Sequence, residues 1–459
     1  STNTFPIGKI GNSLEESKEE PLIIYAKHNK DGYYEQFLAI EDCYKEIESN
    51  YEVVWSNQYE PATPKNQHAS RVYEERFGNK GHSNENIEKV IEDGISNIPD
   101  HDLLVGGFPC QDYSVATTLK RSKGLQGKKG VLWWSIYSIL SQKKTKKPGY
   151  LLLENVDRLL GSPSTQRGRD FAVILSCLYE QGYAVEWRIV NAAEYSMPQK
   201  RKRVYILAYH KSTSVYKKMI NGSHEEWLLK TGIHANAFPV TDEIIAINKG
   251  DISGHPSIES EEFNLGKKTS PFFNSGICIN GEFTSIKTKP KSNKIFPIKD
   301  ILLEDEEIAP EYYVDNTPLD KVIIKKQIDR ESIVIKSTLD MWAYLKGRKN
   351  EERTNKAQGF KYKYSEGSMS YPDGLEKPSR TIITGEGGKS PSRFKHLILK
   401  NGKHRRLTPI ELERLNMFPD NHTYLEGITD AKRAFFMGNA LVIGIVEKLG
   451  IELNKQING

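Results

Sequence analysis

A cysteine, a carboxylate and a pair of arginines each adjoin an apolar segment of the chain. Cys110 follows a short apolar run and two glycines, Glu154 ends a run of three leucines, and Arg201 and Arg203 precede a third apolar stretch. Such runs predict buried strands, and ligands bind at the edge of an open α/β sheet where strands end. A thiolate, a proton-sharing carboxyl and guanidinium groups at one edge could activate an electron-poor ring by covalent addition.

These residues also have simpler structural explanations. Cys110 could be a small buried apolar residue, as many free cysteines are. Glu154 and Arg203 could form a buried ion pair without catalytic meaning. The order in which the three residue types follow one another favours the chemical interpretation.

Five groups of short motifs resemble those of the DNA (cytosine-5) methyltransferases, specifically the prokaryotic type found in restriction–modification systems. They are PCQ (109–111), ENV (154–156), QKRKR (199–203), RLTP with RL and FPD (406–420), and GNALV (438–442). The resemblance runs from about Tyr51 to the C-terminal end. It implies an α/β fold, with a Rossmann-like S-adenosylmethionine-dependent methyltransferase domain and a smaller, irregular inserted target-recognition domain.

A change in composition suggests where the two domains meet. The chain has 459 residues, enough for two domains or more. Residues 1–210 and 425–459 are expected to form the catalytic domain, with residues 1–20 as a loose extension. Residues 211–424 are rich in Ser, Asn, Gly and Lys and have short apolar runs. They are expected to form the DNA target-recognition domain and hinge.

The resemblance also implies a mechanism. The target cytosine leaves the duplex, and Cys110 adds to carbon 6 so that carbon 5 becomes nucleophilic. Glu154 would relieve charge at nitrogen 3, while Arg203, with Arg201 beside it, would hold the oxygen at position 2. The predicted enzyme transfers a methyl group from S-adenosylmethionine to carbon 5 of cytosine in a specific duplex sequence.

The N-terminal cofactor segment departs from the family pattern. The apolar run 21–26 is the expected first strand, but the loop 27–34 after it holds one glycine where the family has about three. Glycine matters there because the backbone must approach the cofactor closely. Either the loop is rebuilt and still admits S-adenosylmethionine, or the site has lost it.

The other cofactor positions match the family in part. Gln58 stands where the family has an acid for the ribose hydroxyls, with Glu60 as an alternative carboxylate, and Tyr59 keeps the aromatic residue that packs on adenine. The remaining cofactor-binding positions that we assign are Asn86, Phe108, Leu132, Asn439 and Ala440.

Two segments are predicted to contact DNA. The first surrounds the lysine-rich loop 115–130, which the resemblance expects to close over DNA, and it contributes Gln111, Ser114 and Lys129. The second is the loop segment 378–393 in the recognition part, where Arg380, Thr381 and Arg393 suit base edges or phosphates. Exposed structural loops would explain the second segment equally well.

Composition sets outer limits on function. Hydrophobic residues make up 37% and charged residues 27% of the chain, and no apolar run approaches a membrane span. The four cysteines are scattered without a CxxC pair, so no metal site or disulfide framework is expected. The net charge of +5 permits double-stranded DNA as partner. We expect a cytoplasmic, nucleoid-associated enzyme with no membrane partner; a cognate restriction endonuclease or a partner subunit is a further candidate.

Two alternatives stay open at this point. The chain could modify carbon 5 of cytosine with a different donor or in the reverse reaction. It could also be a sequence-specific DNA-binding homologue that lacks cofactor binding.

Overall fold

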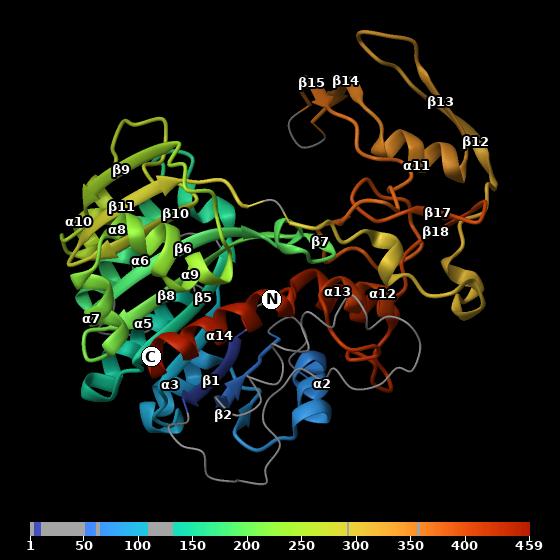
Figure 1. Ribbon diagram of the computed structural model, residues 1–459. Coiled ribbons are helices and arrows are strands. Elements are labelled where there is room, and N and C mark those ends of the chain that lie inside the picture. Colours follow the sequence, from blue (N-terminus) through green and yellow to red (C-terminus); the bar gives the residue numbers. More distant parts are fainter. Residues whose placement is uncertain (1–3, 11–50, 61–64, 109–131, 292, 356–358) are drawn as a thin grey trace. The chain divides into compact units, whose positions relative to one another are not determined.

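The computed structural model describes residues 51–60, 65–108, 132–291, 293–355 and 359–459, together with the backbone of residues 4–10 (Figure 1). The contacts between residues divide the chain into two compact units. Unit 1 consists of Ser1–Tyr195, Arg201–Lys294 and Ile443–Gly459, and unit 2 of Ser196–Lys200 and Ile295–Val442.

Unit 1 is built on a mixed sheet, which has ten strands in the described residues, in the order β3-β2-β1-β4-β5-β8-β6-β10-β11-β9. Its strands are β1 (Thr4–Ile10), β2 (Tyr51–Asn57), β3 (His82–Ser83), β4 (Leu103–Gly107), β5 (Tyr150–Val156), β6 (Tyr183–Asn191), β8 (Lys202–His210), β9 (Ala246–Asp251), β10 (Ser275–Ile279) and β11 (Glu282–Lys287).

The strand pairings fix the direction of every strand. Strands β2, β3, β4, β5, β6 and β11 run one way, and β1, β8, β9 and β10 run the other. The carboxyl ends of β4, β5, β6 and β11 therefore meet the amino ends of β8 and β10 at one edge of the sheet. We call this edge, from Gly107 through Val156, Lys202 and Asn191 to Lys287, the carboxyl edge.

The expectation for the N-terminal residues is wrong in part. Residues 4–10 were assigned to a loose extension, but they form β1, which pairs antiparallel with both β2 and β4. A strand between two others satisfies its backbone hydrogen bonds on both sides, and this long-range pairing has no local sequence signal. The expected first strand, 21–26, and the loop 27–34 lie outside the described residues.

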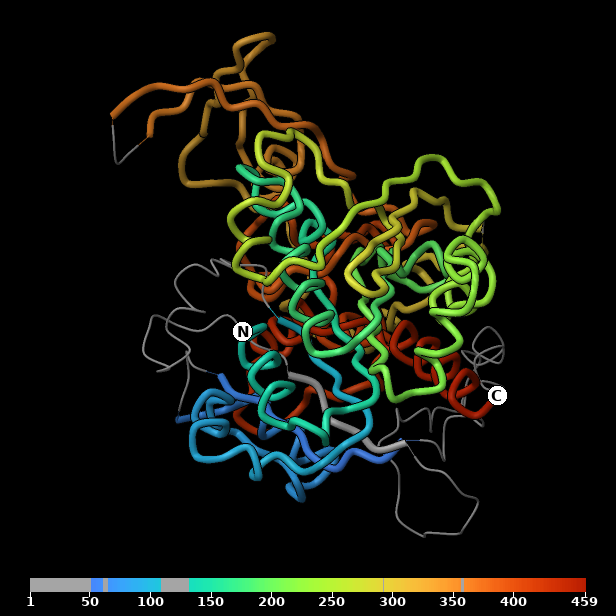
Figure 2. Tube along the Cα trace, turned by 90° about the vertical axis from the view of Figure 1, so that its left-hand side faces the viewer, coloured from blue at the N-terminus to red at the C-terminus, as the bar shows by residue number. Residues whose placement is uncertain are grey.

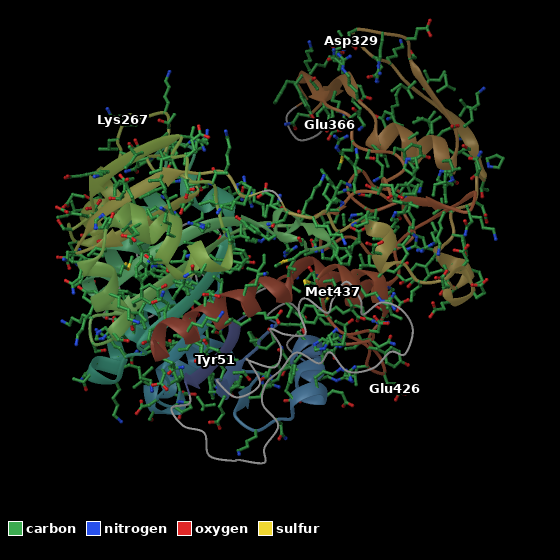
Figure 3. All side chains as sticks on the ribbon, in the orientation of Figure 1. Tyr51, Lys267, Asp329, Glu366, Glu426 and Met437 are labelled. Carbon is green, nitrogen blue, oxygen red and sulfur yellow. The ribbon has the colours of Figure 1, made fainter. Side chains whose placement is uncertain are left out.

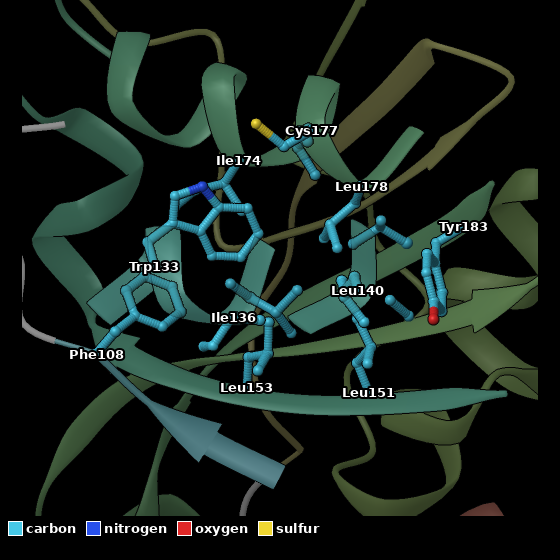
Figure 4. Packing of buried hydrophobic residues seen from close by; sticks show 14 of the residues in the cluster. Phe108, Trp133, Ile136, Leu140, Leu151, Leu153, Ile174, Cys177, Leu178 and Tyr183 are labelled. Atoms are coloured by element: carbon cyan, nitrogen blue, oxygen red, sulfur yellow. The ribbon is translucent and has the colours of Figure 1, made fainter. Parts of the chain in front are cut away.

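One face of the sheet carries the large apolar core of unit 1. Leu151 and Leu153 on β5 are fully buried beneath helices α5 (Leu132–Lys143) and α6 (Arg169–Glu180). Figure 4 shows Phe108 and Trp133 packed at one end of this cluster. Because side chains alternate between the faces of a strand, this packing turns Glu154 to the opposite face.

Helix α14 (Ile443–Asn458), the red C-terminal end of the trace in Figure 2, packs on both α7 (Ser214–Asn221) and α9 (Ile233–Ala237), and these pack on β8 and β6, respectively. Polar side chains on these strands include Glu186 and Arg188, both almost fully buried. Arg188 donates hydrogen bonds to the backbone oxygens of Leu228, His234 and Phe238. These bonds tie the covering segments to the sheet.

The structure divides the chain at other residues than expected. Strands β9, β10 and β11 extend the sheet, so residues 211–294 belong to unit 1 rather than to a recognition domain. At Gly276 on β10, an added Cβ would come within 2.1 Å of the Trp187 ring, so this close strand packing depends on glycine. Residues 425–442 belong to unit 2 and not, as expected, to the catalytic domain.

Unit 2 combines short strand pairs with small helices. Its main elements are β7 (Gln199–Lys200), β12 (Pro318–Lys325), β13 (Ile333–Ser337), α11 (Thr338–Lys346), β14 (Lys349–Thr354), β15 (Lys361–Glu366), β16 (Ser379–Arg380), β17 (Ile398–Lys400), β18 (Lys403–Arg405), α12 (Pro409–Leu415) and α13 (Asp430–Asn439). The strands pair two by two, and β7 pairs with β16 in parallel. A small core around Ile382, Ile398 and Leu412 joins these pieces.

Although no apolar run was expected to approach a membrane span, one stretch of the described residues, 430–458, is long and apolar enough to cross a membrane. It consists of α13 and α14 with a break between them, and 56% of its most apolar window is buried inside the fold. Buried core helices have this composition too.

Candidate active site

Glu154 and Arg203 form an ion pair at the carboxyl edge. Tyr205 on β8 lies directly opposite Glu154 on β5, and Arg203, two residues before Tyr205, projects from the same face of the sheet. Nε of Arg203 lies 2.9 Å from Oε1 of Glu154, and the two side chains are 17% and 18% exposed. The expected pair is therefore formed and remains accessible from solvent.

Each partner keeps hydrogen-bonding capacity. Nη1 of Arg203 donates to the backbone oxygen of Lys202 at 2.8 Å, but Nη2 contacts no acceptor among the described residues. Oε2 of Glu154 likewise has no hydrogen-bond partner there. A free guanidinium nitrogen and a free carboxyl oxygen on one face can bind a ring that carries an oxygen next to a nitrogen.

Burial raises the pKa of Glu154 above its ordinary value, although the charges of Arg203 and Arg201 act against this rise. The carboxyl therefore holds a proton to higher pH than an exposed glutamate does. A carboxyl with a raised pKa can share a proton with a substrate nitrogen near neutral pH.

Arg201 lies beside this pair in the same unit and is 2% exposed. Burial and the neighbouring charge of Arg203 lower its pKa to about 10, while Glu154 raises it. Arg201 thus stays protonated at neutral pH. Two guanidinium groups beside one carboxyl leave excess positive charge, which suits an oxygen that gains negative charge during a reaction.

Asn155 anchors the segment that leads to Cys110. Its Nδ2 donates to the backbone oxygen of Phe108 at 2.7 Å, and its side chain is 2% exposed. The Phe108 ring packs against Trp133 with 5.5 Å between centroids. Cys110 itself, with Gln111, Ser114 and Lys129, lies outside the described residues, so their predicted roles stay predictions.

Asn155 and Tyr205 are the site residues that were missed. Asn155 stands inside the ENV motif but was given no role, although an amide after a strand carboxylate is a suitable backbone clamp. Tyr205 is almost fully buried near Glu154, Arg201 and Arg203, and its hydroxyl has no hydrogen-bond partner among the described residues. Its spacing two residues after Arg203 could have indicated a shared face.

A small apolar cavity of about 30 Å³ lies behind the carboxyl end of β4. Its lining comprises Trp55, Ile87, Leu104, Val105, Gly106, Gly107, Leu132, Ser135, Ile136 and Ile139. Leu132, an expected cofactor residue, is therefore in the lining, and Phe108 follows Gly107 directly. Its lining marks an apolar region at the carboxyl end of β4.

The residues after β2 differ in whether their side chains have a structural role. Gln58 and Tyr59 are half-buried, and the Gln58 N–H donates to the Ser83 oxygen at 2.9 Å. Glu60 has a structural partner, because its Oε2 accepts a bond from the Ala69 N–H in the first turn of α2 (His68–Phe77). This helix-capping contact argues against Glu60 as the ribose carboxylate.

Asn86 also caps a helix. Its Oδ1 accepts from the Glu88 N–H at 2.9 Å and begins α3 (Ile87–Asp93). Asn439 and Ala440 end α13 in unit 2, where Nδ2 of Asn439 donates to the Phe435 oxygen at 3.3 Å. Asn86 lies near the end of β2 in unit 1, because Nδ2 of Asn57 donates to the Glu85 oxygen at 2.9 Å, and the cofactor roles of Asn86, Asn439 and Ala440 stay predictions.

Arg380 is fully engaged inside unit 2. Its guanidinium binds both oxygens of Asp373, at 2.8 and 3.2 Å, and the backbone oxygens of Phe394 and Lys395. Thr381 donates its hydroxyl to the Lys200 oxygen at 2.6 Å. These contacts argue against the prediction that Arg380 and Thr381 bind DNA, because their donors already hold the loop together.

Arg393 has a similar structural role. Its Nε pairs with Glu366 at 2.9 Å, and its other nitrogens donate to the backbone oxygens of Leu345, Gly347 and Gly367. Glu366, labelled in Figure 3, ends β15 and also binds Lys349. A sequence gives no means to tell a DNA-binding arginine from one that clamps a loop.

A family model described as C-5 cytosine-specific DNA methylase matches residues 42–455. The chain belongs to this family. The resemblance drawn from the five motif groups is therefore confirmed, as are the Rossmann-like α/β fold and the assignment as an enzyme that methylates carbon 5 of cytosine in DNA. Members of this family generally take the methyl group from S-adenosylmethionine.

Two relatives illustrate the range of similarity. The chain is 41% identical over 408 residues to the type II methyltransferase M.Sau3AI of Staphylococcus aureus, covering 88% of this chain and 90% of that protein. It is 32% identical over 178 residues to the type II methyltransferase M.HhaI of Haemophilus parahaemolyticus, covering 39% of this chain and 46% of that protein.

Among the described residues of this methylase, no cluster of three or more His, Cys, Asp or Glu side chains could hold a metal ion.

Proposed function

We propose that this methylase uses S-adenosylmethionine to modify a cytosine that is flipped out of a specific duplex sequence, as the modification enzyme of a type II restriction–modification system. The Glu154–Arg203 pair at the carboxyl edge carries the proposal, because the raised pKa of Glu154 matches a proton donor to the ring. The similarity to M.Sau3AI over nearly the whole length of both proteins supports the type II assignment.

The first step is addition of the Cys110 thiolate to carbon 6 of the cytosine. A sulfur–carbon bond forms, and the electron pair of the 5,6 double bond moves into the ring. Glu154 shares or transfers its proton to nitrogen 3 through Oε2, the oxygen that Arg203 does not bind. Arg203, through Nη2, and Arg201 hold the oxygen at position 2, where negative charge also develops.

The second step restores the aromatic ring. Once carbon 5 bears its new methyl group, a base removes the proton from carbon 5 and the Cys110 thiolate leaves carbon 6. Glu154 recovers the proton from nitrogen 3, so the protein returns to its starting state. Asn155 supports both steps by fixing the backbone oxygen of Phe108, two residues before the thiol.

The described cofactor residues fit S-adenosylmethionine in part. Leu132 lines the small apolar cavity behind β4 and would give an adenine ring bound there an aliphatic neighbour, and Tyr59, which follows β2, would supply an aromatic one. Gln58 would bind a ribose hydroxyl, and Phe108 would close the apolar side. When bound, S-adenosylmethionine supplies a methyl group on a positively charged sulfur.

Covalent capture on duplex DNA with 5-fluorocytosine at the target tests the chemistry. Fluorine at carbon 5 prevents elimination, so the wild type should form an adduct that survives denaturing electrophoresis. Cys110→Ala should form none and keep duplex binding largely intact, with Cys177→Ala as the control because Cys177 is buried in the core. An adduct on Cys110→Ala would contradict the mechanism.

Calorimetric titration with S-adenosylmethionine and, separately, S-adenosylhomocysteine tests the donor. Binding at micromolar concentration would show that the loop 27–34 admits the cofactor. Absence of binding, with and without DNA, would contradict the proposed donor. It would favour another donor if capture persists, and a DNA-binding role if capture also fails.

A further inference from the structure

A row of lysines continues β11 beyond the carboxyl edge. Lys287, Lys289 and Lys291 are exposed, whereas Thr288 between them is buried and Pro290 is half-buried. This alternation is that of an extended strand with one face to solvent. The three ammonium groups therefore lie along one side of the segment.

The backbone of this segment is held on both sides. The Asn274 side chain donates to the Thr288 oxygen at 3.0 Å and accepts from the Thr288 N–H at 2.9 Å. On the other side, the Lys289 oxygen accepts from Thr241 at 2.9 Å and the Lys291 N–H donates to the Pro239 oxygen at 3.1 Å. The lysines thus stand on a pre-organised strand, which lowers the entropy cost of binding a ligand along it.

The strand register places the row on the same edge as the catalytic pair. Glu154 on β5 pairs with Tyr205 on β8, and Tyr205 pairs with Arg188 on β6. Arg188 in turn pairs with Ser275 on β10, and Ser275 pairs with Ile286 on β11. Four inter-strand steps of about 4.8 Å put Ile286 roughly 19 Å from Glu154. Since β11 runs parallel to β5, Lys287 and the residues after it continue past the level of Glu154. The three lysines are out of phase with Ile286, so they share the edge of Glu154 but project from the opposite face of the sheet.

The spacing of the row suits a nucleic-acid backbone. Two residues of a strand advance about 6.8 Å, so three lysines spread positive charge over about 14 Å, a length along which one strand of B-DNA presents several phosphates. A separation of roughly 19 Å from Glu154 lies beyond the flipped base itself. The row is therefore suited to phosphates that flank the target rather than to the cytosine.

We propose that Lys287, Lys289 and Lys291 form a phosphate track, which binds the backbone of duplex DNA beside the target cytosine. The proposal rests on the proposed function, because it assumes that the duplex lies over the carboxyl edge. Glu243 opposes it in part, since its carboxylate lies 3.7 Å from Lys289 in an exposed pair. This carboxylate weakens the positive charge of the track. Removing its charge should therefore strengthen DNA binding, whereas removing the lysines should weaken it.

The salt dependence of duplex binding tests the track without requiring activity. The triple variant Lys287→Ala, Lys289→Ala, Lys291→Ala removes three charges. Its matched control is Lys144→Ala, Lys211→Ala, Lys217→Ala, which removes three exposed charges near the opposite edge, where β5 begins and β8 ends. Affinity for a labelled duplex is measured by fluorescence anisotropy between about 50 and 200 mM salt, where log K falls by about 0.9 per phosphate contact per decade of salt.

The track variant should lower the slope of log K against log salt by about 2 to 3 and weaken binding roughly tenfold or more at low salt. The control should keep the wild-type slope within about 0.5. Glu243→Gln should tighten binding and leave 5-fluorocytosine capture by Cys110 intact. Equal slopes for the track variant and its control, or unchanged binding by Glu243→Gln, would overturn the track.

The two proposals fail in different ways. If the proposed chemistry is wrong, capture is absent in the wild type whatever the salt slope. If only the track is wrong, the wild type still captures the target and the track variant binds duplex as the control does.

Discussion

Unit 1 and unit 2 each contain an arginine bound to a carboxylate, and the two pairs differ in what else the arginine contacts. Arg203 donates one bond to Glu154 and one to a backbone oxygen, and its Nη2 has no acceptor among the described residues. Arg380 binds both oxygens of Asp373 and two backbone oxygens. Asp373 also binds Lys346 and the Leu397 N–H.

The pKa values of the two carboxyls shift in opposite directions. Burial raises the pKa of Glu154 more than two arginines lower it. Burial also acts to raise the pKa of Asp373, but the hydrogen bond from Arg380 and the surrounding positive charges lower it to about 2. An ion pair whose donors and acceptors all have partners holds a charge in place. An ion pair at an edge that keeps a donor and an acceptor without partners can still bind a substrate and share a proton. Residue type alone does not separate these two roles.

The largest expected effect is on the rate of the variant Glu154→Gln. Glutamine keeps the size of the side chain but cannot give a proton to nitrogen 3. Because general acid catalysis contributes about 10²- to 10⁴-fold, the single-turnover methylation rate should fall by that factor. Duplex affinity and the thermal midpoint should stay close to wild type. A rate within about threefold of wild type would mean that the ion pair of Glu154 is structural and not catalytic.

The matched change in unit 2 should act on stability. Asp373→Asn leaves the buried Lys346 and the partly exposed Arg380 without their carboxylate, and breaking a buried pair costs about 3–5 kcal/mol. Urea denaturation should show a lower free energy of unfolding for unit 2. The methylation rate per folded molecule should change far less than in Glu154→Gln. A large loss of rate in Asp373→Asn together with a large loss of stability in Glu154→Gln would contradict the assignment of Glu154 to catalysis and of Asp373 to stability.

The response to pH should separate the same two carboxyls. The pKa of Asp373 is depressed, so its stabilising contribution is present above about pH 4 and is lost as the pH falls toward about 2. The stability difference between wild type and Asp373→Asn should therefore shrink by about 2 kcal/mol over this interval. Urea midpoints of both proteins at several pH values measure the change.

Glu154 should respond on the alkaline side. Its pKa is raised and its protonated form is the reactive one, so the wild-type single-turnover rate should fall as the pH rises through that pKa. Glu154→Gln should lack this descending limb, because it has no proton to lose. A descending limb that persists unchanged in the variant would assign the titration to another group.

The sequence predicts the strands of the catalytic edge well because they are apolar runs that end in charged residues. Tyr51–Asn57 and the run that ends at Val156 appear as β2 and β5, and side-chain alternation brings Glu154 and Arg203 together. The strands are local features of the chain, whereas the β5–β8 pairing that brings Glu154 and Arg203 together is not. The family motifs add the chemical roles, which the strands alone do not provide.

Long-range pairings could not be predicted in the same way. Residues 4–10 become β1 because β2 and β4 flank them, and β10 joins the sheet because Gly276 admits the Trp187 ring. The prediction that Arg380 and Arg393 contact DNA rests on their place in a polar loop. Their partners, Asp373 and Glu366, are acidic residues in other segments, and no local pattern connects them.

The smallest expected effect concerns two buried tyrosine hydroxyls. Tyr344 in unit 2 donates to Glu351 at 2.8 Å, whereas the Tyr205 hydroxyl has no partner among the described residues. Tyr344→Phe should therefore cost about 1.5–3 kcal/mol, the usual contribution of a hydrogen bond to a charged group. Tyr205→Phe should leave the free energy of unfolding unchanged or raise it slightly, because it removes an unsatisfied buried group.

The methylation rate of Tyr205→Phe then decides what that hydroxyl does. Urea denaturation and single-turnover kinetics on the same preparations measure stability and rate together. A normal rate would make Tyr205 a tolerated packing residue beside Glu154. A rate that falls severalfold at unchanged stability would mean that the hydroxyl finds its partner only when the cytosine is bound, as expected for a group aimed at the reacting ring. Loss of stability equal to that of Tyr344→Phe would contradict the contrast between the two units at this position.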